Sequence, residues 1–128
     1  MKYLGLTFGL AAVVLFLACG AGHPNIQSIQ VNPQQAQASS PRGEVGFTAM
    51  GIFSNNDSRE LTAADGAKWV TSNNLISTID SNTGQATCIA PGTVTVTVTA
   101  PSNLTFTVNN SINNTSQKVS GTATLVCT

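Results

Sequence analysis

The segment Thr93-Val94-Thr95-Val96-Thr97-Val98-Thr99 decides the fold class of this chain. Valine and threonine alternate through it, so in an extended strand the valines share one face and the threonines share the other. A strand that is buried on one face and wet on the other has this period of two. We therefore expect Val94 and Val96 to lie in the core of a sheet protein.

Shorter segments of the same kind lie on both sides of this strand, separated by turn residues. Residues 44–53 place Phe47 on one face together with Val45, Ala49 and Phe53. The only tryptophan, Trp69, lies in a short strand at 68–71. Further strands are expected at 26–31, 75–80, 85–90, 104–108 and 119–127, and residues 59–64 form either a strand or a turn of helix. About seven or eight short strands with frequent turns predict an all-β sandwich.

Two stretches fit this pattern less well. Residues 34–40, rich in Gln, Ala and Ser, show only weak patterning. Gly121 interrupts the inward face of the last strand, a position typical of a β-bulge.

The composition excludes some classes of partner. Charged residues make up only 8% of the chain and the formal net charge is zero. Without a basic stripe, nucleic acid is not an expected partner. The polar surface must come from Thr, Ser, Asn and Gln, which favour strands and turns.

The N-terminal residues have the order of a secretory signal. Lys2 precedes an apolar run over residues 4–18. A helix that spans a bilayer needs about 20 apolar residues, so this run is short for a permanent anchor. A signal peptide that is removed after export fits its length better.

Cys19 ends this apolar run, in Phe16-Leu17-Ala18-Cys19, which resembles the cleavage and lipidation site of bacterial lipoproteins. The resemblance implies that the mature chain begins at Cys19 and is anchored by acyl chains. Gly20 stands where Asp would retain such a protein in the inner membrane, so the outer membrane is implied. The alternative is an ordinary signal cut after Gly20 or Gly22, which discards Cys19. We expect a cleaved signal over 1–18, a tether over 19–25 and one domain over 26–128.

The two remaining cysteines, Cys88 and Cys127, both lie in expected strands. An exported chain enters an oxidising compartment, where an even number of cysteines tends to pair. We predict a Cys88–Cys127 disulfide. The alternatives are two buried thiols or a metal pair, although no histidine or Cys-x-x-Cys spacing accompanies them.

Residues 26–99 also resemble a bacterial immunoglobulin-like domain of group 2, a module of intimin- and invasin-type surface proteins. The matching stretches are 28–33, Gly43, 47–51, 68–72, 76–80, Gly84 and 90–96. The resemblance implies an immunoglobulin-like β-sandwich with Trp69 in its core and with Gly84 and Gly92 in turns. The chain departs from the family after Thr99, where an Asn-rich stretch precedes the last strand. We expect an extended hairpin over about 100–127.

No set of residues predicts catalysis. The only histidine, His23, falls in the tether, and the five acids are scattered along the chain. The segment Asp80-Ser81-Asn82-Thr83-Gly84 superficially resembles the start of a calcium loop, but Pro91 stands where the later Glu ligand belongs, so an Asx turn is favoured. Trp69 as a sugar platform is the alternative to its place in the core.

The Asn-rich tip is the remaining candidate for recognition, through Asn109, Asn110, Asn113 and Asn114. Loops on rigid sandwiches often bind partners. The alternative is a solvated hairpin end with no partner. We expect a non-enzymatic, exported, lipid-anchored module without cofactor or metal. Its role would be recognition, adhesion or envelope structure through a protein or glycan ligand. The alternative is an accessory subunit that docks onto a secreted enzyme or envelope complex.

Overall fold

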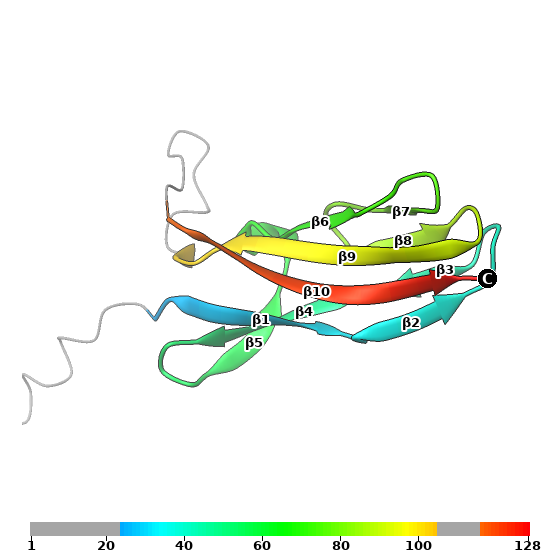
Figure 1. Ribbon diagram of the computed structural model, residues 1–128. Helices are drawn as coiled ribbons and strands as arrows, with labels where there is room; N and C mark the ends of the chain where they lie inside the picture. The colour runs from blue at the N-terminus through cyan, green and yellow to red at the C-terminus, as the bar shows by residue number, and fades with distance from the viewer. Residues whose placement is uncertain (1–23, 105–115) are drawn as a thin grey trace, which may run out of the picture.

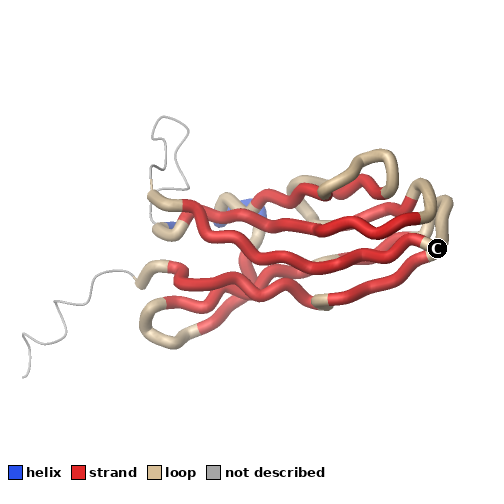
Figure 2. Tube along the Cα trace, viewed as in Figure 1, coloured by secondary structure: helices blue, strands red, loops and turns tan. Residues whose placement is uncertain are grey.

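A computed structural model describes residues 24–104 and 116–128, in which nearly all regular structure is β-strand (Figure 1). The expectation of an all-β, sandwich-like fold is confirmed for this part of the chain. The strands are β1 (Ile26–Asn32), β2 (Gln35–Ala38), β3 (Glu44–Gly46), β4 (Thr48–Phe53), β5 (Ser58–Leu61), β6 (Lys68–Thr71), β7 (Ser77–Ile79), β8 (Gln85–Cys88), β9 (Gly92–Pro101) and β10 (Lys118–Cys127). One short 3-10 helix, η1 (Ala63–Asp65), separates β5 from β6, and the strands dominate the trace in Figure 2.

The strands form two layers. One layer is a four-stranded sheet in the order β2-β10-β9-β6, in which β2 runs parallel to β10 and the other pairs are antiparallel. The other layer consists of two three-stranded sheets, β1-β4-β5 and β3-β8-β7. Only Phe47 separates β3 from β4, so these two sheets meet at that residue.

The core lies between the layers. The alternation of the decisive segment is preserved in β9, where Val94, Val96 and Val98 are buried. The same core holds Phe47 from the other layer and Trp69 from β6, together with Ile26, Ile29, Val31, Ala49, Phe53, Leu61, Ala67, Ala86, Cys88, Ala100, Ala123, Leu125 and Cys127.

The expected single strand over residues 44–53 is wrong: it is two strands in different sheets. β3 pairs with β8, whereas β4 pairs with β1 on one side and β5 on the other. At the break, the Phe47 backbone N–H donates to the Gly84 carbonyl oxygen at 3.0 Å. Alternation continues through the break because Phe47, Ala49 and Phe53 are all buried, so periodicity alone could not reveal it.

The structure also has more strands than the seven or eight expected. Residues 34–40 contain β2, which pairs in parallel with the end of β10 from Gln35↔Thr124 to Ala38↔Cys127. Residues 59–64 combine the two expected alternatives, because the end of β5 is followed directly by η1. β2 depends on pairing with β10 and η1 depends on its cap, and neither depends on an alternation of apolar residues in its own sequence.

Gly121 does not mark a bulge. It pairs with Val98 in a ladder between β9 and β10 that has no register shift from Lys118↔Pro101 to Cys127↔Gly92. The glycine instead allows the layers to approach: a Cβ at position 121 would lie 2.5 Å from the Ile29 carbonyl oxygen of β1. The interruption in the sequence pattern therefore reports a close contact between strands of opposite layers.

Candidate functional site

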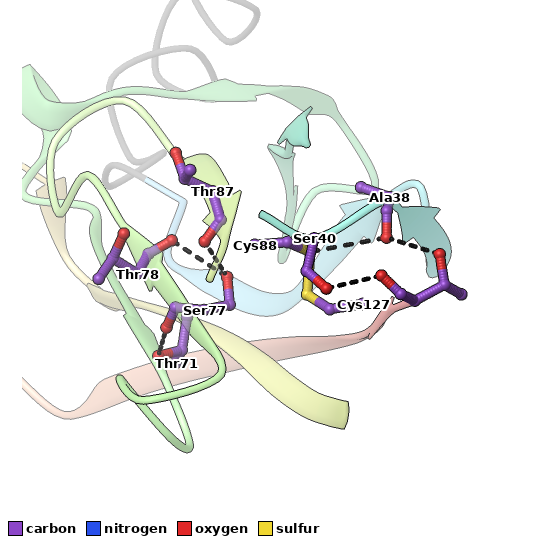
Figure 3. The surroundings of a disulfide bond; sticks show 9 residues. Ala38, Ser40, Thr71, Ser77, Thr78, Thr87, Cys88 and Cys127 are labelled. Carbon is purple, nitrogen blue, oxygen red and sulfur yellow. Dashed lines mark hydrogen bonds between the residues drawn. A yellow bond between two sulfur atoms is a disulfide. The ribbon is translucent and has the colours of Figure 1, made fainter. Parts of the chain in front are cut away.

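The predicted disulfide joins the two layers. Cys88 ends β8 and Cys127 ends β10, their Cα atoms are 5.6 Å apart, and both residues are buried (Figure 3). The prediction of a Cys88–Cys127 bond is confirmed, which removes the alternatives of free thiols and a metal pair. Since the bond lies in the core, we assign it a structural role.

Hydrogen bonds hold the chain around this disulfide. The Ser40 hydroxyl donates to the Thr128 carbonyl oxygen at 2.6 Å, and the Thr128 N–H donates to the Ala38 carbonyl oxygen at 2.9 Å. Ser77, the only buried polar residue in the described part of the chain, donates through its hydroxyl to the Thr87 carbonyl oxygen at 2.9 Å (Figure 3). Because the Ser77 hydroxyl has a hydrogen-bond partner within the protein, its burial is explained without a bound ligand.

Trp69 is a core residue, only 4% exposed, so it cannot serve as a surface platform for sugars. Its ring lies 6.4 Å from that of Phe47, measured between centroids. The other core residues expected from the sequence, Val94 and Val96, belong to the same buried cluster.

One end of the domain, which we call the tether end, holds the start of the described chain. The Ile26 N–H donates to the Ser102 carbonyl oxygen at 2.8 Å, and the Ser102 N–H donates to the Gln117 carbonyl oxygen at 2.7 Å. β9 and β10 pair antiparallel at this end, and the described residues stop at Leu104 and resume at Ser116.

Several predicted site residues lie outside the described residues: Cys19, His23, Asn109, Asn110, Asn113 and Asn114. Most of the expected strand at 104–108 does so as well. The described residues that flank the Asn-rich stretch nevertheless lie beside Ile26.

A shallow hollow of about 330 Å³ lies at the tether end, lined by Pro24, Phe53, Asp57, Ser58 and Arg59. The guanidinium of Arg59 is already engaged, since it donates to both carboxylate oxygens of Asp65 at 3.0 and 2.9 Å and lies 5.6 Å from the centre of the Phe53 ring. The Asp65 carboxylate also accepts from the Thr62 N–H at 2.9 Å. The bonds from Arg59 lower the pKa of Asp65, and those to Asp65 raise the pKa of Arg59. This cation is not free to bind an anion.

The opposite end, which we call the distal end, is formed by the loops at 39–43, 72–76 and 89–91 and by residue 128 (Figure 1). Backbone hydrogen bonds join these loops: Arg42 N–H to Cys88 O at 2.8 Å, and Ile89 N–H to Ile76 O at 2.7 Å. β9 runs between the two ends, and its length at about 3.3 Å per residue separates them by about 30 Å.

The distal end exposes apolar side chains. Leu75 is 80% exposed and Ile89 is 46% exposed. The expected strand over 75–80 is wrong at its start: β7 begins at Ser77, and Leu75 lies in the turn before it. We refer to Arg42, Leu75 and Ile89 together as the distal patch.

Arg42 has a strained backbone. Its φ of 81° lies in the left-handed region, which costs a residue with a Cβ about 1–2 kcal/mol. Its side chain is exposed, and the only ion pair within residues 24–104 and 116–128 is Arg59–Asp65. Glu44, the nearest acid in sequence, has its Oε2 within 3.5 Å of the Gln85 side-chain nitrogen.

The loop that resembles the start of a calcium site is a capped turn. The Asp80 carboxylate accepts from the backbone N–H groups of Asn82 at 2.8 Å and Thr83 at 3.1 Å. These bonds lower the pKa of Asp80. In the part of the chain that the structure covers, no group of three or more His, Cys, Asp or Glu side chains is placed to hold a metal ion. No helix in that part is long and apolar enough to cross a membrane.

No protein-family model matches the sequence, and no curated protein is significantly similar to it.

Proposed function

We propose that this protein is an exported, lipid-anchored and non-enzymatic module of the bacterial cell envelope, with an immunoglobulin-like fold and a role in recognition. The observation that carries the proposal is the disulfide between the layers, because such bonds form and persist mainly in oxidising compartments such as the periplasm or cell surface. The apolar run that ends at Cys19 supplies a route to that compartment.

The strand order supports the immunoglobulin-like part of the proposal. That fold pairs strands A, B, E and D in one sheet and C, F and G in the other. Here β1 pairs with β4, β3 with β8 and β8 with β7, while β6 pairs with β9 and β9 with β10. The same order follows if β1 is A, β3 and β4 together are B, and β6 is C.

Trp69 gives a second line of support. Immunoglobulin domains place a buried tryptophan on strand C, and Trp69 is buried on β6, which has that position in the order. The disulfide differs, because antibody domains join B to F whereas this chain joins the counterparts of E and G. Since fold does not imply activity, the recognition role depends on surface residues.

Acyl labelling tests the anchor. The full gene would be expressed in a Gram-negative bacterium that is fed a clickable palmitate analogue, beside a Cys19→Ser variant. We expect the unchanged protein to carry the label and to fractionate with membranes, and the variant to carry no label. An unlabelled, freely soluble protein with an intact Cys88–Cys127 disulfide would show that the chain is exported but not lipidated. That result would overturn the anchor.

A further inference from the structure

We propose that a second copy of this chain pairs with the open edge of β2, so that two four-stranded sheets join into one. The two β2 strands would run antiparallel about a two-fold axis beside Ala36. This pairing is a self-association of the folded domain, so it goes beyond the recognition role proposed above and does not depend on the lipid anchor.

One side of β2 carries backbone groups without a partner. The carbonyl oxygens of Gln34 and Ala38 each accept a backbone hydrogen bond of 2.9 Å from the end of the chain that contains β10. In a parallel ladder every second residue turns both of its backbone groups toward the partner strand, so Ala36 also faces β10. Gln35 and Gln37 therefore direct their N–H and C=O groups away from β10. Among the described residues, no strand pairs with β2 on that side.

Two other sheet edges carry the protection that β2 lacks. On the outer side of β6, the Trp69 N–H donates to the Ser81 carbonyl oxygen at 3.0 Å. On β5, the Glu60 carbonyl oxygen accepts from the Arg59 guanidinium at 3.2 Å, and both residues are charged. Such features keep strands of other molecules from pairing with an edge. The sequence of β2, Gln-Ala-Gln-Ala, has no charge and no proline, so nothing in it opposes pairing.

The chemistry of this edge favours a strand as the occupant, and its self-complementarity favours a second copy. N–H and C=O groups at two alternate residues are matched by another extended backbone. In an antiparallel pair centred on Ala36, Gln35 lies opposite Gln37 of the second copy, and Gln37 lies opposite its Gln35. Each of these two pairs exchanges two hydrogen bonds. The same strand supplies both halves of the contact, as an isologous interface requires.

The side chains of β2 suit this pairing. Ala36 would lie opposite Ala36 of the second copy at a position without hydrogen bonds, where Cα atoms approach to about 4.5 Å and small side chains fit. Gln35 and Gln37 are exposed, and their amides can both donate and accept across the junction. A hollow of about 240 Å³, lined by Gln35, Ala36, Gln37 and Val126, gives these amides room beside the edge.

Disulfide trapping tests the pairing. The full chain with Ala36→Cys would be expressed in a Gram-negative bacterium, treated with a mild oxidant and analysed on a non-reducing gel. The central pair brings the two thiols within disulfide reach, so we expect a reducible dimer. Gln37→Cys is the matched control, because residue 37 is the more exposed of the two. In this register its Cα atoms lie more than about 7 Å apart, so it should link at least about tenfold less.

Three results of the trapping experiment would overturn the proposal. They are no dimer with Ala36→Cys, equal linking with Gln37→Cys, and linking of Ala36→Cys to a different protein. Thermal midpoints equal to that of the unchanged protein, with the Cys88–Cys127 bond intact, would show that both variants are folded.

Sedimentation of the purified full chain in detergent solution needs no new thiol. We expect a monomer–dimer equilibrium that shifts with concentration, since a four-residue edge gives only a small interface. Gln35→Lys combined with Gln37→Lys would place like charges opposite one another and should raise the dissociation constant about tenfold or more.

Thr93→Lys combined with Thr95→Lys is the control for this charge, because both threonines are exposed on β9, away from the edge of the same sheet. This pair should leave the dissociation constant unchanged. A monomer at every concentration, or an equal effect of the two lysine pairs, would overturn the proposal. A dimer of a chain that carries no acyl group would overturn only the anchor.

Discussion

Gly84 lies against the indole of Trp69: a Cβ built on Gly84 would be 2.9 Å from Trp69 Cε2 and 2.6 Å from the Phe47 carbonyl oxygen. The φ of Gly84 is 78°, in the region that only glycine adopts without cost. The turn before β8 and the packing of Trp69 therefore both require that residue 84 has no side chain.

Gly84→Ala should lower the free energy of unfolding by about 2–4 kcal/mol, because it adds backbone strain to a steric clash. Urea unfolding followed by Trp69 fluorescence would measure the loss. Gly46→Ala is the control, since a Cβ there would meet only the end of the Gln85 side chain, at 3.1 Å. Equal losses in the two variants would contradict the assignment.

Gly121→Ala should destabilise the protein by about 1–3 kcal/mol, because its Cβ would press β10 against the Ile29 carbonyl of the facing layer. Differential scanning calorimetry would detect a lower midpoint. Thr122→Ala, an exposed neighbour in the same strand, should change the stability by no more than about 0.5 kcal/mol. A loss at Thr122 as large as that at Gly121 would contradict the close contact between layers.

Replacing both Cys88 and Cys127 by Ala should cost about 4 kcal/mol. The bond closes a loop with a sequence separation of 39, and chain entropy gives this magnitude for that length. Chemical unfolding of the variant and of the unchanged protein would measure the difference. Because both cysteines are buried, thiol alkylation after mild reductant treatment should be slow unless the protein unfolds. Rapid alkylation of folded protein would contradict this location.

Acid should weaken the Arg59–Asp65 bridge. The pKa of Asp65 is lowered on folding, so the unfolded chain binds its proton more readily, and stability falls as the pH drops from about 4 through the folded value. Asp65→Asn should reduce stability at pH 7 and flatten this acid slope, as measured by unfolding at several pH values. Asp80, whose pKa is also lowered, should still contribute to the acid dependence of stability in the Asp65→Asn variant. Identical slopes in both proteins would exclude the bridge as the cause.

The alternation of Val94, Val96 and Val98 was sufficient to predict an all-β fold, since burial of one sheet face imposes that period. The number of free cysteines left after Cys19 was sufficient to predict the disulfide. The first prediction depends on a local sequence pattern, and the second depends on the even number of cysteines that remain.

The errors arose where a neighbouring strand decides the structure. Residues 34–40 form β2 because the end of β10 offers a free edge, and the sequence of β2 contains no trace of that partner. The break at Phe47 preserves the alternation of buried residues, so the sequence pattern does not reveal it. Leu75 was expected in the same strand as Ser77, yet its backbone N–H donates to the Asn73 side-chain oxygen in the turn before β7.

The separation of the tether end from the distal patch has a mechanical consequence. A pull between Ile26, where β1 begins, and the loops of the distal end would act parallel to the strands. Cross-strand hydrogen bonds lie perpendicular to such a pull, so they would be sheared together rather than peeled apart one at a time. The covalent link at Cys88 and Cys127 would limit sliding of the two layers at the end where the pull is applied.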